Sequence, residues 1–324
     1  MRLSLAVPAL FMAFIAAGGA NYKTLVIGAL FSLAFAYGVA RGENVRWLEK
    51  PLGLREEHFR GAFVLSLLLI LLQLAMIRDV PLIHPSAKAL LNSRLTALTY
   101  LLGVPSSVYL FLRGKKYSLT YPILVALYAY RTPVMVSLLA LGSAYLEERR
   151  VGMRHIAIFG ALLGTAFFGL AVLRGDALSS QLVRVQATTS VLDVIVTRAP
   201  WHGFYHGALQ WAGIRSYVIG GFSPRYLTAR FLYINTGVSI TSTLMGGMYL
   251  DFGLFSVIEA LLLGLYFGVI GTARELENRV LYYTTLAYAL VGVETGILDL
   301  PVYLFYLAGF YVVLRGKYRV VRVA

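Results

Sequence analysis

The sequence predicts an all-α fold, a polytopic transmembrane helical bundle, and two observations point to it. Of its 324 residues, 59% are hydrophobic and only 14% are charged, whereas a soluble domain is about one-half apolar and about one-quarter charged. Apolar runs also recur along nearly the whole chain, and they are too long and too uniform for barrel strands, which alternate in polarity. Composition therefore indicates helices in a membrane.

We expect about ten spans, with both termini in the cytoplasm. Some runs are shorter than the roughly 20 residues that cross a bilayer. The pair around Arg131 is the shortest, so those two helices are tilted, partly re-entrant or divided at the wrong residue. The expected spans are 3–20, 24–40, 61–77, 94–112, 117–130, 132–146, 156–173, 254–272, 281–296 and 298–315.

The distribution of basic residues supports this orientation. Lys and Arg gather in the short segments that the ten-span topology places inside, as the positive-inside rule requires. The net charge of +14 is thus explained by topology, and nucleic acid is not an expected partner. The first apolar run lacks a convincing small-residue cleavage site, so we interpret it as a retained span. The chain has no cysteine, which excludes disulfides and thiolate chemistry.

We expect residues 1–324 to form a single integral membrane domain, with 174–253 as one large extracytoplasmic loop containing short helices. Apolar residues of Ser179–Val196 recur at helical spacing, as in a helix lying on a membrane surface. The aromatic and histidine-rich Trp201–Trp211 is typical of an interfacial segment. Glycine and proline punctuate Gly220–Gly237, which predicts a loop.

Arginines on the predicted outer side are the first candidates for chemistry. Arg131 lies between apolar runs, where a charge is costly unless it faces a cavity or a partner; the alternative is that it caps a helix turn and reaches water. Arg225 and Arg230 flank a four-residue stretch and could converge on one anion, because a guanidinium binds phosphate through two parallel hydrogen bonds. For these two the alternative is a solvated or headgroup-binding loop. Arg94 and Arg184 complete the set, and for Arg184 the alternative is a residue on the polar face of an amphipathic segment.

Acid–base candidates are fewer. His202 and His206 are four residues apart, so on a helix they would share a face, yet no acidic cluster or zinc motif accompanies them. Either histidine could act as a general base. The carboxylates near the outer boundary could orient an arginine or take a proton: Asp193, Asp251, Glu294 and Asp299. No nucleotide-binding loop or serine-nucleophile motif occurs.

One stretch carries a family resemblance: "GFSPRYLTARFLYINTGVSITSTLMGGMYLDFGLFSVIEALLLGLYFG". Its Pro224–Arg225, its Gly246–Gly247 and its Tyr249…Phe252–Gly253 resemble the signature region of the oligosaccharide repeat unit polymerases, the O-antigen polymerase (Wzy-type) family, related to the O-antigen ligases. "YAYRTPVMVSLLAL" is similar to the family's Arg-containing segment. The ligases carry a histidine before the Tyr-Leu segment, and this chain has none there.

The resemblance implies a GT-C-like membrane glycosyltransferase. It would join two polyprenyl-(pyro)phosphate-linked oligosaccharides at the outer face, without metal or cofactor, with a chain-length regulator or flippase as a further partner. The hinge Asp251–Gly253 would lie over the cavity, with glycines letting backbone approach the ligand. We assign the expected roles as follows: catalytic Arg131, Arg225, Arg230, His206 and Asp251; substrate-binding Arg94, Arg184, His202, Tyr249 and Glu294.

Other classes remain open at this point. A ligase or another lipid-dependent glycosyltransferase is the near alternative. A transporter or flippase for an anionic lipid-linked substrate would suit ten spans, although we find no inverted repeats, which that class often has. A structural membrane partner would not need a cluster of outer arginines.

Overall fold

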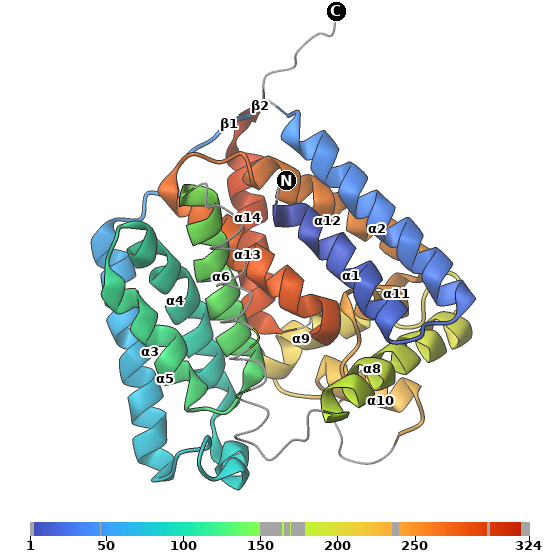
Figure 1. The fold of residues 1–324 in the computed structure, drawn as a ribbon, viewed down its shortest axis with the longest axis horizontal. Coiled ribbons are helices and arrows are strands. Elements are labelled where there is room, and N and C mark those ends of the chain that lie inside the picture. Colours follow the sequence, from blue (N-terminus) through green and yellow to red (C-terminus); the bar gives the residue numbers. More distant parts are fainter. Residues whose placement is uncertain are drawn as a thin grey trace, which may run out of the picture. The chain divides into compact units, whose positions relative to one another are not determined.

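The computed structural model describes residues 3–45, 47–149, 164, 169, 179–234, 240–296 and 299–318. The described part is predominantly α-helical, with one two-stranded antiparallel sheet (Figure 1). The chain divides into two compact units. The first unit contains 1–50, 181–273 and 288–324, and the second contains 51–180 and 274–287.

The first unit is built from both ends of the chain and a central segment. Strands β1 and β2 pair Trp47 with Tyr318 and Leu48 with Lys317. Its elements are α1 (Ala6–Ala17), α2 (Tyr22–Glu43), β1 (Trp47–Leu48), α8 (Ser179–Arg198), α9 (Ala208–Val218), α10 (Pro224–Phe231), α11 (Leu244–Phe252), α12 (Ser256–Ile270), α14 (Leu300–Arg315) and β2 (Lys317–Tyr318). A 3-10 turn, Leu3–Leu5, precedes α1 and another, Gly253–Phe255, joins α11 to α12.

The second unit is helical throughout its described part. Its elements are α3 (Glu56–Ile77), a 3-10 turn (Pro85–Leu90), α4 (Ser93–Leu112), a 3-10 turn (Lys116–Leu119), α5 (Thr120–Ala126) and α6 (Arg131–Arg149). Helix α13 (Leu276–Thr295) begins in this unit and ends in the first.

Helices α2 and α12 lie side by side along two pairs of glycines (Figure 1). A Cβ added at Gly264 would lie 2.1 Å from the carbonyl oxygen of Phe35, and one added at Gly38 would lie 2.3 Å from that of Leu261. One turn further on, Gly42 and Gly268 face each other. Each helix therefore carries a Gly-x-x-x-Gly pattern that lets two backbones touch, as in membrane helix pairs.

In the second unit, aromatic and polar side chains join the helices. The ring of Phe59 on α3 stacks on Tyr109 of α4, with centroids 3.9 Å apart. The buried Gln73 donates from Nε2 to the Tyr128 hydroxyl at 2.6 Å and accepts from Thr96. Interhelical hydrogen bonds of this kind stabilise helix packing where no water competes.

The all-α prediction is confirmed, and the apolar helices support a membrane protein. Within the described residues, four helical stretches are long and apolar enough to cross a membrane: Tyr22–Glu43, Glu56–Ile77, Ser93–Leu112 and Leu244–Ile270. Leu3–Ala17 and Leu300–Arg315 are shorter apolar helices. The count of ten spans and the single membrane domain stay predictions.

One of the expected spans differs in the structure, and another lies almost wholly outside the described residues. In place of 117–130 lie a 3-10 turn and α5, a helix of 7 residues that is about 10 Å long, too short to cross a bilayer. The chain then turns through Ala129, whose φ of 57° no helix tolerates. The expected span 156–173 lies outside the described residues, apart from 164 and 169.

The central segment forms short helices. The helix expected over Ser179–Val196 is confirmed as α8. The loop expected over Gly220–Gly237 is wrong in its middle, where α10 forms. Ser223 caps α10 by accepting from the Tyr226 N–H at 3.3 Å, and Pro224 occupies the first turn, where a missing N–H has no cost.

Candidate functional site

The Asp251 carboxylate, on α11, binds the start of α9. It is fully buried. Oδ1 accepts from the N–H of Leu209 and Oδ2 from that of Gln210, both at 2.9 Å. These N–H groups begin α9, where a helix has unsatisfied donors and a positive dipole end. Because both oxygens are engaged, Asp251 acts as the cap of α9 here.

The glycines beside Asp251 allow backbone to touch backbone. Gly203 and Gly253 have φ of +90° and +58°, and a Cβ at Gly203 would lie 2.1 Å from the Asp251 carbonyl oxygen. A Cβ at Gly253 would lie 2.1 Å from that of Trp201. The glycines at this hinge thus let the backbone of residues 201–203 approach that of residues 251–253. The expected approach of this backbone to a ligand stays a prediction.

A cavity of about 510 Å³ opens beside this junction and brings two guanidinium groups together. Its walls come from the end of α8, the turn after it, and α10. Among the residues that the structure describes, neither Arg198 nor Arg230 makes an ion pair. We call it the arginine cavity; it is lined by Arg198, Pro200, Phe204, Tyr205, Leu227, Arg230, Phe231 and Tyr233.

Neutral aromatic groups complete the walls of the arginine cavity. The Phe204 ring meets Phe231 edge-on at 5.1 Å. The Tyr205 hydroxyl donates to the carbonyl oxygen of Leu227 at 2.8 Å. Burial raises the pKa of Tyr205, and the charge of Arg230 opposes that rise. The phenol is therefore neutral at physiological pH, and the cavity carries positive charge that an anion could neutralise.

Two other predicted site arginines of the first unit, Arg184 and Arg225, are held by carboxylates. Arg225 donates from a terminal nitrogen to Asp299 at 3.0 Å, and Arg184 pairs with Glu294. The expectation that these carboxylates could orient an arginine thus has two examples. The arrangement leaves Arg230, together with Arg198, as the guanidinium pair that faces a cavity.

His202 and His206 come together, although not on a helix. Their rings stack with centroids 5.3 Å apart and planes inclined by 14°, and both residues are exposed. His206 has a φ of 50°, so the pair belongs to a turn. In the described part of the chain, no group of three or more His, Cys, Asp and Glu is placed to hold a metal ion.

The remaining predicted residues lie elsewhere. Tyr249 is buried on α11. Arg94 is exposed in the first turn of α4, and Arg131 is half-buried at the start of α6. Both of these arginines belong to the second unit. The expected roles, catalysis for Arg131 and substrate binding for Arg94, stay predictions.

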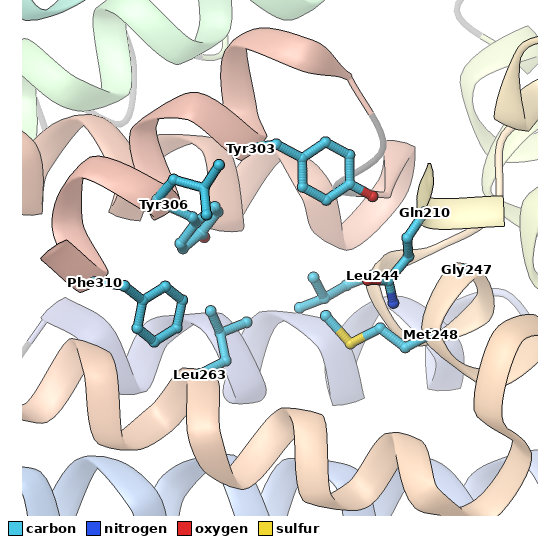
Figure 2. A pocket seen from close by; sticks show the side chains of 9 residues that line it. Gln210, Leu244, Gly247, Met248, Leu263, Tyr303, Tyr306 and Phe310 are labelled. Atoms are coloured by element: carbon cyan, nitrogen blue, oxygen red, sulfur yellow. The ribbon is translucent and has the colours of Figure 1, made fainter. Parts of the chain in front are cut away.

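A second cavity, of about 210 Å³, lies between α9, α11, α12 and α14. Figure 2 shows the Tyr303 ring directing its oxygen toward Gln210 at one end of this cavity, with Phe310 and Leu263 at the other. We call it the tyrosine pocket; it is lined by Gln210, Leu244, Gly247, Met248, Leu263, Tyr303, Tyr306, Leu307 and Phe310.

Sequence reasoning missed several of these groups. Arg198 is not among the expected site residues, although it ends the helix expected over Ser179–Val196. Glu259 was passed over within an apolar span, where an ionisable residue is itself a signal of function. Gln210 and Tyr303 gave no signal, because only the fold brings them together.

The apolar helices indicate a multi-pass, all-α membrane protein. The family model described as "Putative O-antigen polymerase" matches residues 3–306, so the chain belongs to this family and the expected resemblance is confirmed. A relative, "Uncharacterized protein MJ0419" of Methanocaldococcus jannaschii, is 28% identical over 309 residues, covering 86% of this chain and 85% of the relative. No solved structure matches the chain.

Proposed function

We propose that this protein polymerises lipid-linked oligosaccharide repeat units. It would transfer a glycosyl chain from a polyprenyl-(pyro)phosphate donor to a sugar hydroxyl of a second lipid-linked unit. The family supports a membrane polysaccharide polymerase in general. The observation that carries the finer assignment is the arginine cavity, in which Arg198 and Arg230 face one space.

The charge of this cavity suits the donor. The leaving group of a sugar (pyro)phosphate is an anion, so catalysis depends mainly on fixed positive charge where negative charge develops. Two guanidinium groups supply that charge, and each can bind phosphate oxygens in pairs. The rings of Phe204 and Phe231 form apolar walls beside this charge. Phe204 is 50% exposed and both arginines are exposed, so the site is open to water.

The ion pairs position this machinery. Arg225 binds Asp299 and so fixes α10, the helix that presents Arg230. Asp251 fixes the start of α9 and the turn that carries Tyr205. In this proposal Arg225 and Asp251 orient the site, while the exposed His202 and His206 contact the sugar.

The proposal places the arginine cavity at the extracytoplasmic side, as the positive-inside rule favours. Arg94 and Arg131 would bind further parts of the substrate, and Arg184, Glu294 and Tyr249 would support the first unit. A membrane-embedded enzyme is required because both substrates keep their lipid tails in the bilayer.

Complementation tests the proposal. In a strain lacking the protein, wild type should restore long polysaccharide, whereas Arg230→Ala and Arg198→Ala should leave single repeat units on the gel. Arg215→Ala, an exposed arginine of α9 that does not line the cavity, is the matched control and should restore full length. Long polymer from the two cavity variants, at normal protein levels, would refute the assignment.

A further inference from the structure

We propose that the polar end of the tyrosine pocket binds the acceptor sugar hydroxyl and that Glu259 takes its proton. This inference rests on the proposed function and adds to it the group that activates the acceptor. It is carried by three side chains from three helices: Glu259 of α12, Gln210 of α9 and Tyr303 of α14.

Tyr303 is the observation that points to a ligand. Its hydroxyl oxygen is buried and has no hydrogen-bond partner among the residues that the structure describes. A buried polar group without a partner costs about 1–3 kcal/mol, and such groups are rare in native structures. Since the hydroxyl is directed toward Gln210 inside the pocket (Figure 2), a bound hydroxyl would satisfy it.

Glu259 does not itself line the pocket, but it contacts Gln210, which forms the polar end of it. It accepts from Gln210 Nε2, with its two oxygens at 3.0 and 3.2 Å. It stands four residues before Leu263, a wall of the pocket, and residues four apart share a helix face.

Gln210 is held so that it joins these groups. Its backbone N–H donates to Asp251 and its side-chain amide donates to Glu259. The amide that lines the pocket is thus fixed at both ends, as a preorganised binding group requires. Asp251 also accepts, through its carbonyl oxygen, from the His206 N–H, next to Tyr205 of the arginine cavity. The two cavities therefore share one anchor.

The neighbouring acids are less suited to take a proton. Both Asp251 oxygens accept backbone N–H bonds, and Asp299 is paired with Arg225, so both carboxylates are already engaged. Glu259 has a neutral amide as its partner among the described residues. Its carboxylate keeps lone pairs available, and an ionisable group within a membrane helix normally has a function.

The remaining walls of the pocket are apolar. Tyr306, Leu307 and Phe310 continue the face of α14 that begins at Tyr303, and Leu244 and Met248 come from α11. A cavity of about 210 Å³ with a polar group at one end suits a small hydroxyl-bearing moiety. Apolar walls limit competing water, which would otherwise hydrolyse the donor.

The proposed step balances as follows. The acceptor hydroxyl oxygen forms a bond to the anomeric carbon of the donor sugar while its proton passes to the Glu259 carboxylate. The bond from the anomeric carbon to the phosphate oxygen breaks, and its electron pair stays on the leaving lipid (pyro)phosphate. Glu259 then returns the proton to solvent. Tyr303 and Gln210 hold the hydroxyl in place.

Kinetic assays test the role of Glu259 as proton acceptor. They use purified protein in lipid nanodiscs, supplied with lipid-linked repeat units extracted from a strain lacking the protein. Glu259→Gln keeps the shape and the contact with Gln210 but cannot accept a proton, so kcat should fall about 100-fold or more with KM little changed, and the alkaline rise of the kcat profile should vanish. Tyr303→Phe should mainly raise KM. Glu57→Gln, an exposed carboxylate of α3, should match wild type.

The outcomes separate the two proposals. If Glu259→Gln keeps wild-type kcat while Arg230→Ala is inactive, the proton-acceptor assignment fails and the polymerase proposal stands. If Arg230→Ala is fully active as well, the proposed function itself fails. Glu259→Asp restores a carboxylate and so controls for misfolding. A kcat partly recovered relative to Glu259→Gln supports the assignment. A kcat equal to that of Glu259→Gln overturns it.

Discussion

The Arg225 guanidinium lies 3.0 Å from the Asp299 carboxylate and joins α10 to the residue before α14. The side chains are 35% and 34% exposed, so we expect the pair to contribute no more than about 1 kcal/mol to stability. Its importance is orientation, because α10 also carries Arg230 of the arginine cavity.

A charge exchange tests this role. Arg225→Asp should place two carboxylates together and shorten the polysaccharide, whereas Arg225→Asp combined with Asp299→Arg should recover long chains, since an ion pair again fixes α10. Gel analysis in a complemented deletion strain measures the result. If the exchanged pair stays inactive at normal protein levels, Arg225 contacts the substrate itself, and the positioning role is wrong.

Asp251→Asn should destabilise the protein strongly despite its equal size. One carboxylate oxygen becomes an amide donor that faces the N–H of Leu209 or Gln210, so one buried N–H loses its partner and the α9 dipole loses its charge. Together these cost about 2–4 kcal/mol. The melting temperature in detergent, followed by tryptophan fluorescence, should fall by several degrees. An unchanged melting temperature would show that Asp251 is not the anchor.

Gly253→Ala should also unfold the site. A Cβ there meets the Trp201 carbonyl oxygen at 2.1 Å, and φ is +58°, which disfavours any residue with a Cβ. Gly61→Ala is the control, because Gly61 lies in α3 with open space around its Cα, where alanine favours the helix. We expect a lowered melting temperature for Gly253→Ala and an equal or raised one for Gly61→Ala. Equal effects of both would contradict the backbone contact.

The contact between α2 and α12 predicts a different defect. Gly264→Val would force a side chain into the carbonyl oxygen of Phe35, 2.1 Å from the Cβ position, and separate the helices at a cost of about 1–3 kcal/mol. Leu262→Ala, on the exposed side of α12, should cost much less. Protein yield from membranes and the melting temperature compare the two variants. Comparable losses would mean that close glycine packing does not hold this pair together.

Sequence patterns predicted the helices well, because apolar periodicity reports directly on burial in a membrane or a core. The helical class and the α8 helix follow from that pattern. The short α5 did not, since a left-handed Ala129 leaves no mark in composition. The helix α10 was missed because Gly220, Gly221 and Pro224 suggest a loop, whereas Ser223–Pro224 is in fact a helix start.

Sequence analysis predicted which types of residue form the candidate site better than it predicted which residues they contact. The expectation of arginines on an outer side directed attention to Arg230. Its neighbour Arg198 and the ion pairs of Arg184 and Arg225 depend on tertiary packing. Glu259 and Tyr303 lie 44 positions apart in apolar runs, so no local pattern could connect them.

The central claim, that Arg198 and Arg230 together hold a lipid-linked phosphate, is tested most directly by binding. Farnesyl pyrophosphate, a short polyprenyl pyrophosphate, can be titrated into the purified protein in nanodiscs. Each charge-assisted contact contributes about 1.5–3 kcal/mol, so each alanine variant should raise the Kd by about 10-fold or more. The double variant should raise it further, and Arg215→Ala should match wild type. Equal affinity of wild type and the double variant would contradict the account.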